Sequence, residues 1–423
     1  MADTAKRITF EKPGIEKSLL AFVGKDDALH IARARKHGFE AYEVQDVPVR
    51  VGHVWKRTRA QQFVPNVSYA MDAANFMVSH SNGEANEIQF LCGADLFITL
   101  TEEAQKAGVE VTGLKESPAQ IGTAVPPSQG YFEALNQTLW GTGIFLRIPR
   151  GVQLKAPLYV NVHTDGRYPF IRMNFVLEEG ASATLIERID SSSHSGHTVM
   201  VSEVSLFNGA SLSHALIFNQ NAKDTLHYTH GCNLGSSAGL NMAATSVGGG
   251  TVKACLSGNL VGERAHSEIR TFGVVQDNAE LGFHTRQHHV APKTISDMKS
   301  RSVLLDKAVS SNTGLIRIEE EARDCEAYQI SRNLMLSKEA EATAIPELEI
   351  ENNDVICSHG AATGTLDLNQ LFYLQSRGLS EGAATRLIVE GSMDALLEGQ
   401  PDVVQQLFKD AHERVFERLE NRK

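Results

Sequence analysis

The sequence has few cysteines and no long hydrophobic segment. Its 423 residues include five cysteines, no two of which form a Cys-x-x-Cys pair. The longest apolar run near the start, residues 19–23, is too short for the core of a signal peptide, and no later stretch reaches membrane-spanning length. These absences predict a cytoplasmic protein without membrane contact, whose thiols stay reduced and are mostly buried.

Basic clusters and the motifs of common enzymes are also missing. The formal net charge is −11, and no run of lysine and arginine is dense enough to bind nucleic acid. The three glycines at 248–250 lack the context of a phosphate-binding loop, and there is no Gly-x-Ser-x-Gly elbow. The acidic residues form no pair that the sequence can place together. We therefore expect neither an NTPase nor a serine or glycoside hydrolase.

The first 140 residues mix helical and strand patterns. Asp26 and Asp27 can cap a helix that ends near Gly38, and a further helix is expected at residues 131–139, before a strand at 143–149. Trp55, one of only two tryptophans, lies in the basic segment VRVGHVWKRT at residues 49–58. The simpler interpretation is that Trp55 anchors the N-terminal segment on the protein body, and the alternative is a binding role.

A repeat without a strict motif occupies residues 144–345. Short strand-like runs each follow a small or polar turn residue and an alanine, and successive alanines are 29, 28, 27, 14, 29, 14 and 18 residues apart. Near-regular strands without interleaved helices favour a stacked β-solenoid, with a β-sandwich as the alternative. Both ends of a solenoid must be covered, and the terminal helices are expected to cover them. The alanines are Ala181, Ala210, Ala238, Ala265, Ala279, Ala308, Ala322 and Ala340.

Helical periodicity returns after Arg377. Ser380 is expected to open a helix that breaks at residues 399–401, and a second helix with an apolar stripe follows. The simpler interpretation is a helical hairpin that packs on its own solenoid. An apolar face on a terminal helix pair is also suited to docking a partner, and this remains the alternative.

The segment Cys357-Ser358-His359 offers the most distinctive chemistry. Side chains alternate between the faces of a strand, so Cys357 and His359 would point the same way and Ser358 the opposite way. A thiolate and an imidazole can bind zinc or iron, but a structural site usually needs about four ligands. The missing ligands must come from elsewhere in the fold or from another chain. Alternatively, Ser-His-Gly is simply a turn in the last coil.

The histidines at 284, 288 and 289 form a second possible metal group. On a strand, His284 and His288 would share a face. No carboxylate or cysteine lies at ligand spacing from them, so surface or turn roles are favoured.

Several segments resemble the SufB/SufD family of iron–sulfur cluster assembly proteins. Residues 346–391, PELEIENNDVICSHGAATGTLDLNQLFYLQSRGLSEGAATRLIVEG, resemble the family's C-terminal signature. Residues 132–160, FEALNQTLWGTGIFLRIPRGVQLKAPLYV, resemble the start of its β-helix. HVWKRT at 53–58 and FLCGADLFITLTEEAQKAGVEV at 90–111 resemble N-terminal parts of SufD. The resemblance thus covers most of the chain, and its C-terminal part is the most specific.

Two positions make the chain more similar to SufD than to SufB. SufB has Cys-Arg-Asn where this chain has Ser331-Arg332-Asn333, and Glu-His-Glu-Ala-Thr where it has Ser358-His359-Gly360 followed by two alanines. The cysteine and glutamate associated with cluster building in SufB are therefore Ser331 and Gly360 here. The resemblance implies a scaffold that does not build a cluster alone and is not an enzyme, because ATP hydrolysis belongs to SufC.

The family resemblance also implies an architecture and partners. It predicts a right-handed parallel β-helix at residues 141–366, between an N-terminal helical and mixed region at 1–140 and a C-terminal helical region at 367–423. SufB would pair with the β-helix end, and the ATPase SufC would bind the C-terminal helices. His359, with Cys357 beside it, would assist a transient iron–sulfur cluster shared with SufB.

Some alternatives stay open at this stage. The resemblance does not decide whether flavin binds, and a homodimer is possible in isolation. One alternative function is a self-sufficient homodimeric scaffold. The other is a polysaccharide-active β-helix enzyme, which would require secretion and a groove of Asp and Arg residues.

Overall fold

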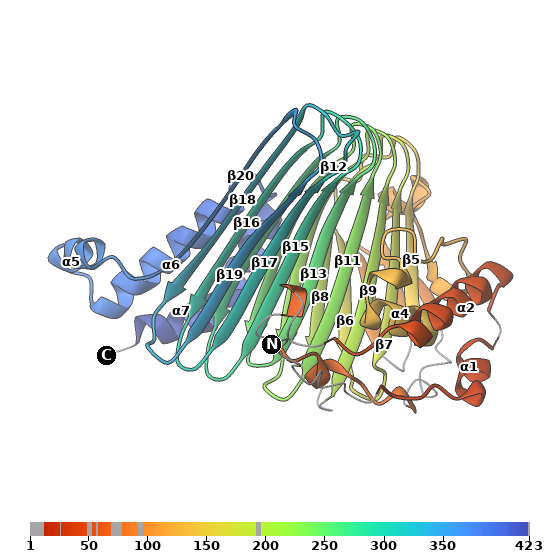
Figure 1. Cartoon of the computed structure of the whole chain (residues 1–423), viewed down its shortest axis with the longest axis horizontal. Coiled ribbons are helices and arrows are strands. Elements are labelled where there is room, and N and C mark those ends of the chain that lie inside the picture. Colours follow the sequence, from red (N-terminus) through yellow and green to blue (C-terminus); the bar gives the residue numbers. More distant parts are fainter. Residues whose placement is uncertain are drawn as a thin grey trace, which may run out of the picture.

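Two parallel β-sheets face each other along most of the chain (Figure 1). The computed structural model describes residues 12–25, 27–48, 53–55, 58–68, 78–91, 96–191 and 196–421. One sheet has eleven strands in the order β1-β3-β2-β6-β8-β10-β12-β14-β16-β18-β20, and the other has nine in the order β19-β17-β15-β13-β11-β9-β7-β5-β4. Successive strands alternate between the sheets, which defines a parallel β-helix. The solenoid prediction is confirmed, and the sandwich alternative is wrong.

The strands lengthen to ten or eleven residues in the body of the β-helix. Their bounds are β1 Val78–Asn82, β2 Asn86–Leu91, β3 Leu96–Leu100, β4 Glu110–Gly113, β5 Thr142–Ile148, β6 Leu158–Thr164, β7 Phe170–Leu177, β8 Ser182–Ser191, β9 His197–Leu206, β10 Ser211–Gln220, β11 Thr225–Leu234, β12 Gly239–Gly248, β13 Thr251–Leu260, β14 His266–Val275, β15 Glu280–His289, β16 Ile295–Leu304, β17 Val309–Ile318, β18 Cys325–Met335, β19 Glu341–Ile350 and β20 Val355–Thr365.

Helices lie at both ends of the chain. They are α1 Lys17–Val23, α2 Leu29–Val44, α3 Glu102–Lys106, α4 Tyr131–Leu139, α5 Leu368–Ser376, α6 Glu381–Leu397 and α7 Asp402–Glu420, with short 3-10 helices η1 His53–Trp55, η2 Ala60–Phe63, η4 Leu114–Glu116 and η5 Pro127–Gln129. In the part of the chain that the structure covers, no helix is long and apolar enough to cross a membrane.

The turns explain the alanine repeat. At one corner a residue with left-handed backbone recurs once per coil, as at Gly180 (φ 67°), Gly209 (φ 68°) and Ser237 (φ 56°). The Gly180 amide donates to the carbonyl of Asn208 in the next coil at 2.9 Å, so the corners stack in register. The alanine that follows each of these residues points inward and is buried. A larger side chain there would crowd the sharp corner.

The N-terminal helices cover the outer face of the nine-stranded sheet. Helix α2 continues through Gly38 to Val44, so its predicted end was wrong: a Cβ on Gly38 would lie 3.0 Å from Gln137 of α4, and the glycine permits this close crossing. Asp27 does not cap α2 but pairs with Arg35 at 2.8 Å. Trp55 is buried in this cluster, as an anchor would be. Asp26, Cys92 and the Lys-Arg pair after Trp55 lie outside the described residues.

The C-terminal helices α6 and α7 cover the outer face of the eleven-stranded sheet. The Ser380 side chain caps α6 by accepting from the amide of Ala383 at 3.1 Å. Phe272 of the sheet belongs to the same buried apolar cluster as Val404 and Phe408 of α7. The predicted hairpin on its own solenoid is confirmed. Most side chains of β20 are exposed, however, so the described helices do not cover the last coil. The expectation of a covered C-terminal end was therefore wrong.

The first strands of both sheets come from the N-terminal region. Strands β1 to β3 extend the eleven-stranded sheet, and β4 pairs antiparallel with β5 in the other sheet. The predicted domain boundaries near 140 and 366 remain predictions.

Candidate functional site

Cys357 and His359 lie on β20, the last strand of the eleven-stranded sheet. In the β18–β20 register Cys357 is opposite Ala327 and His359 is opposite Gln329. The segment is a regular strand, so the alternative of a turn at Ser-His-Gly is wrong. Both residues occupy inward-facing positions, because their register partners Ala327 and Gln329 are buried in the β-helix.

The two candidate ligands differ in burial. Cys357 is half-buried and packs against the main core, whereas His359 is exposed. Burial raises the pKa of the Cys357 thiol, and the nearby Cys325 raises it further. The thiol is therefore protonated at neutral pH and must lose its proton to bind a metal.

The chain does not complete a ligand set around these residues. Within the described ranges, no group of three or more His, Cys, Asp or Glu side chains could hold a metal ion. The neighbouring thiol of Cys325 is buried and lies 3.1 Å from the hydroxyl of Thr294. Cys357 and His359 thus offer half of a site at most.

Ser331 and Gly360 flank this half site. Ser331 lies on β18 opposite Ala361, and its buried hydroxyl has no hydrogen-bond partner among the described residues. A Cβ on Gly360 would meet nothing within 4 Å, so a larger side chain would fit there. A thiol at 331 would face the interior one coil before His359, but serine is a poor ligand for soft metals.

The two edge strands of the last coil differ in a way that matters for pairing. β19 carries Pro346, Glu347 and Glu349, and both proline and charge discourage another strand from adding to an edge. β20, with the sequence VICSHGAATGT, has neither proline nor a lysine, arginine or carboxylate. The edge that presents Cys357 and His359 is therefore the one that lacks features discouraging the addition of another strand.

The other histidine group is held by structural hydrogen bonds. His284 bonds to the hydroxyl of Thr313 at 2.8 Å, and His288 to Glu319 at 2.5 Å. His289 is buried between the hydroxyls of Thr294 and Ser296. The predicted surface or turn roles were wrong, because all three histidines lie on strand β15 and His289 is fully buried.

A buried polar group inside the β-helix escaped the sequence analysis. Glu187 of β8 is fully buried and accepts from His214 at 2.8 Å and from the hydroxyl of Tyr228 at 3.2 Å. Burial raises the pKa of Tyr228, and the negative Glu187 adds to this effect. Only the strand register shows that these residues face inward, and the register could not be read from the sequence.

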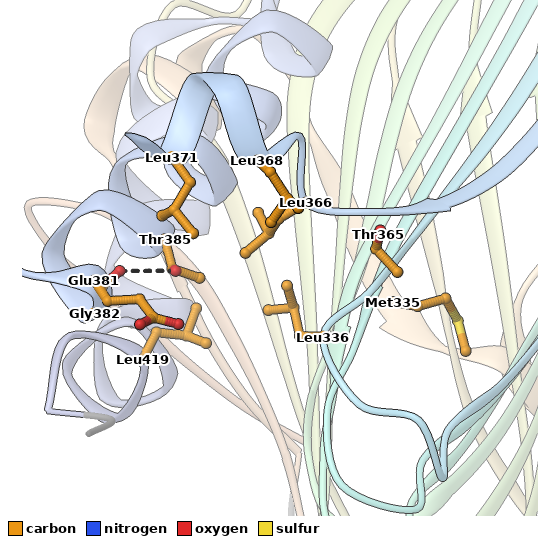
Figure 2. A pocket seen from close by; sticks show the side chains of 10 residues that line it. All are labelled: Met335, Leu336, Thr365, Leu366, Leu368, Leu371, Glu381, Gly382, Thr385 and Leu419. Carbon is orange, nitrogen blue, oxygen red and sulfur yellow. Dashed lines mark hydrogen bonds between the residues drawn. The ribbon is translucent and has the colours of Figure 1, made fainter. Parts of the chain in front are cut away.

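Helix α5 projects from the C-terminal end and exposes apolar side chains. Figure 1 shows it beyond α6, away from the sheets. Leu368 is 75% exposed and Phe372 72%. A groove of about 360 Å³ lies beside the helix, and it is lined by Leu371 of α5, Leu336 after β18 and Thr385 of α6 (Figure 2). An apolar helix and groove side by side are typical of a protein-docking surface.

Comparison with known proteins identifies the family. The family model described as "SUF system FeS cluster assembly, SufBD core domain" matches residues 160–392, more than half of the chain. The chain belongs to the SufBD family. Proteins of this family are scaffold components of iron–sulfur cluster assembly. The match begins in β6, includes β20 and ends in α6, so it contains the half site.

Curated relatives carry both subunit names. The chain is 29% identical over 274 residues to the iron–sulfur cluster assembly protein SufD of Bacillus subtilis, covering 63% of this chain and 62% of that protein. It is 25% identical over 351 residues to SufB of the same organism, covering 81% and 72%. A SufBD family protein of Synechocystis sp. is 24% identical over 294 residues, covering 66% and 61%. The chain thus spans about three fifths of the SufD and Synechocystis relatives. These identities do not separate SufD from SufB.

Proposed function

We propose that this protein is a SufD-like scaffold subunit for iron–sulfur cluster assembly, which pairs with SufB through β20. The observation that carries the proposal is the free edge of β20, which has no proline or charged side chain to discourage strand addition. It presents a thiol and an imidazole, and the described part of the chain completes no metal site around them. A partner strand added to this edge would bury the half-exposed last coil and bring its own ligands beside Cys357 and His359. The nascent cluster is cargo at this interface.

The SufD-like assignment rests on what replaces the ligands of SufB. Ser331 and Gly360 stand where SufB has a cysteine and a glutamate, and neither can serve as a soft-metal ligand. In the isolated chain the pKa of the Cys357 thiol is raised, so the thiol is deprotonated only when a metal held by the partner binds it. A subunit of this kind contributes His359, and Cys357 when deprotonated, to a site that SufB completes.

The ATPase SufC is the partner proposed for the C-terminal helices. The exposed face of α5 and the groove beside it supply an apolar docking surface. Because α6 and α7 are packed on the same sheet that contains β20, a partner that moves these helices acts on a body continuous with the half site. ATP hydrolysis stays with SufC, and this chain is a non-catalytic scaffold.

The edge assignment is tested by mixing the purified chain with SufB and SufC and measuring the mass of the assembly by light scattering. We expect a complex that contains all three subunits. Gly360→Lys places a charge on the β20 edge without a steric clash, and it should abolish pairing with SufB while the fold persists. Gly14→Lys, also free of clashes, is the matched control. Unchanged pairing of Gly360→Lys would contradict the edge assignment, and a dimer of this chain that excludes SufB would favour the homodimeric scaffold.

The half site is tested by cluster yield on the same complex. His359→Ala should lower the yield of iron–sulfur cluster without changing the mass of the complex, because His359 is exposed and supports no packing. Ser358→Ala, on the opposite face of β20, should leave the yield unchanged. Equal yields from the two variants would refute the role of His359.

A further inference from the structure

A cavity of about 440 Å³ lies between the N-terminal region and the outer face of the nine-stranded sheet. Its lining comes from the segment after α2, from η1, from the start of α4 and from β11, β13 and β15. The volume is within the range of pockets that hold small organic ligands. Cys357 and His359 belong to the other sheet, so the cavity is not part of the half site.

The sheet side of the cavity carries an arginine and a lysine that form no ion pair with a carboxylate in the described ranges. Arg286 lines the cavity, and its guanidinium forms one side-chain hydrogen bond within the described chain, to Nδ1 of His288 at 3.2 Å. Glu349 and Glu319 act on the guanidinium only at longer range. Lys253 is fully buried on the same sheet face, and its amine has no hydrogen-bond partner in the described ranges. Its amine lies 5.8 Å from the ring centre of Trp55. Gly282 makes room for it, because a Cβ there would lie 2.9 Å from Cδ of Lys253.

Burial favours the neutral forms of the titratable groups around the cavity, and it lowers the pKa of Lys253 as well. Burial, with a smaller contribution from the nearby Lys253, lowers the pKa of His227 and of His284 to about 3. Burial raises the pKa of the Cys255 thiol to about 12. Glu133 at the start of α4 accepts from the hydroxyl of Thr229 at 2.6 Å, and burial raises the pKa of its carboxyl.

Two buried polar atoms of the lining have no hydrogen-bond partner among the described residues. They are Nδ1 of His227 and Oε1 of Gln45. His227 is only 1% exposed and is stacked between Trp55 and Phe132, so its free nitrogen cannot turn to bulk water. Buried polar atoms without partners are costly, and a bound molecule would satisfy them. Asp46, exposed on the N-terminal side, is the second carboxylate that lines the cavity.

We propose that this cavity binds a small organic anion, whose carboxylate or phosphate group is held by Arg286 with Lys253 behind it. A guanidinium without a carboxylate partner supplies charge-assisted, bidentate donors for such a group. His227 and Gln45 fix the remainder of the molecule through their free polar atoms. This site goes beyond the proposed function and does not depend on pairing with SufB.

The sign of the electrostatic potential in the cavity is tested with tryptophan fluorescence. In a Trp140→Phe variant, Trp55 is the remaining tryptophan and lines the cavity. We expect iodide to quench Trp55 more strongly than caesium does, relative to free N-acetyltryptophanamide at equal ionic strength, and Arg286→Met to remove this preference. Equal quenching by the two ions, or a preference that persists in Arg286→Met, would overturn the assignment of an anion site.

Binding itself is tested with sodium benzoate and inorganic phosphate as probes, by calorimetry on the full chain. Saturable binding of benzoate identifies a carboxylate site, and saturable binding of phosphate identifies a phosphate site. Arg286→Met should lower the affinity for the probe about tenfold, which is the scale expected for losing one charge-assisted contact. Arg188→Met, which removes an arginine from the other sheet, should not. Binding of neither probe below about 10 mM would refute the proposal.

Discussion

At the scale of single residues, burial sets the chemistry of the titratable groups. His412 of α7 is fully buried, where its ring nitrogens bond to the hydroxyl of Thr245 at 3.1 Å and to the carbonyl of Phe408 at 2.8 Å. This burial lowers the pKa of His412 to about 4. The imidazole is therefore neutral in the folded protein, and protonation opposes the docking of α7 on the sheet.

The pH dependence of stability follows from this shift. Above about pH 6.5 His412 is neutral in both the folded and the unfolded chain, so its titration does not change the free energy of unfolding. As the pH falls, the unfolded chain takes up the proton first, and stability is lost until the folded pKa near 4 is reached. At pH 5 the loss from this residue is about 2 kcal/mol.

His412→Gln tests this linkage, because glutamine can keep a hydrogen bond to Thr245 without titrating. Unfolding by guanidinium is measured at pH 7 and pH 5 for both proteins. The native chain should lose about 2 kcal/mol more than the variant between these pH values. The other buried histidines are common to both chains and cancel in the difference. An equal loss in both would contradict the assignment.

The half site shows how far residue-level prediction reached. Strand alternation correctly placed Cys357 and His359 on one face of β20. The different burial of the two side chains could not be predicted, because it depends on β20 being the final strand of its sheet. The cavity next to Trp55 was missed for a similar reason. Its residues on β11, β13 and β15 lie far apart in sequence, and only the coil register brings them together.

At the scale of elements, the C-terminal helices have two separate roles. α6 and α7 bury apolar side chains of the sheet such as Ile217, Phe272 and Val303. Truncation after residue 379 would expose these side chains, so a loss of partner binding by that truncated chain would not distinguish docking from misfolding. Helix α5 stands apart from this packing and can be changed alone.

Phe372→Asp tests α5 as the SufC docking element. The side chain is 72% exposed, so the folded chain should keep its stability. Affinity for SufC, measured by calorimetry, should fall at least about tenfold, because a buried aromatic anchor typically dominates such contacts. Gln370→Asp adds the same charge to another exposed residue of α5 and should have a smaller effect. Wild-type affinity in Phe372→Asp would exclude α5 from the contact.

Local sequence rules predicted elements whose signals are local. The bounds of α4 and the Ser380 cap of α6 were correct, because capping and helical periodicity act within a few residues. The predicted end of α2 was wrong because Gly38 permits a close contact with Gln137 of α4, which is distant in sequence. Tertiary packing there overrides the tendency of glycine to end helices.

At the scale of the whole molecule, the β-helix makes stability depend on neighbouring coils. Each interior strand pairs on both sides, whereas β19 and β20 pair on one. The alanine spacing predicted the stacking, since one corner residue recurs per coil. Which faces the helices cover could not be predicted from that spacing, because the helices follow the apolar outer positions of the sheets. The last coil is left as the natural place for a partner to continue the solenoid.

Hydrogen exchange tests whether the terminal strands are less stable than the interior strands. In the free chain, amides of β19 and β20 should exchange faster than those of β11 to β14, because an edge strand opens without disturbing a second neighbour. Addition of SufB should slow exchange in residues 355–365 of β20. Residues 341–350 of β19 should change less, since Pro346 and its glutamates resist strand addition. Peptides from β12 serve as the internal control. Protection of β19 with β20 unchanged would move the proposed interface to the other sheet and separate it from Cys357 and His359.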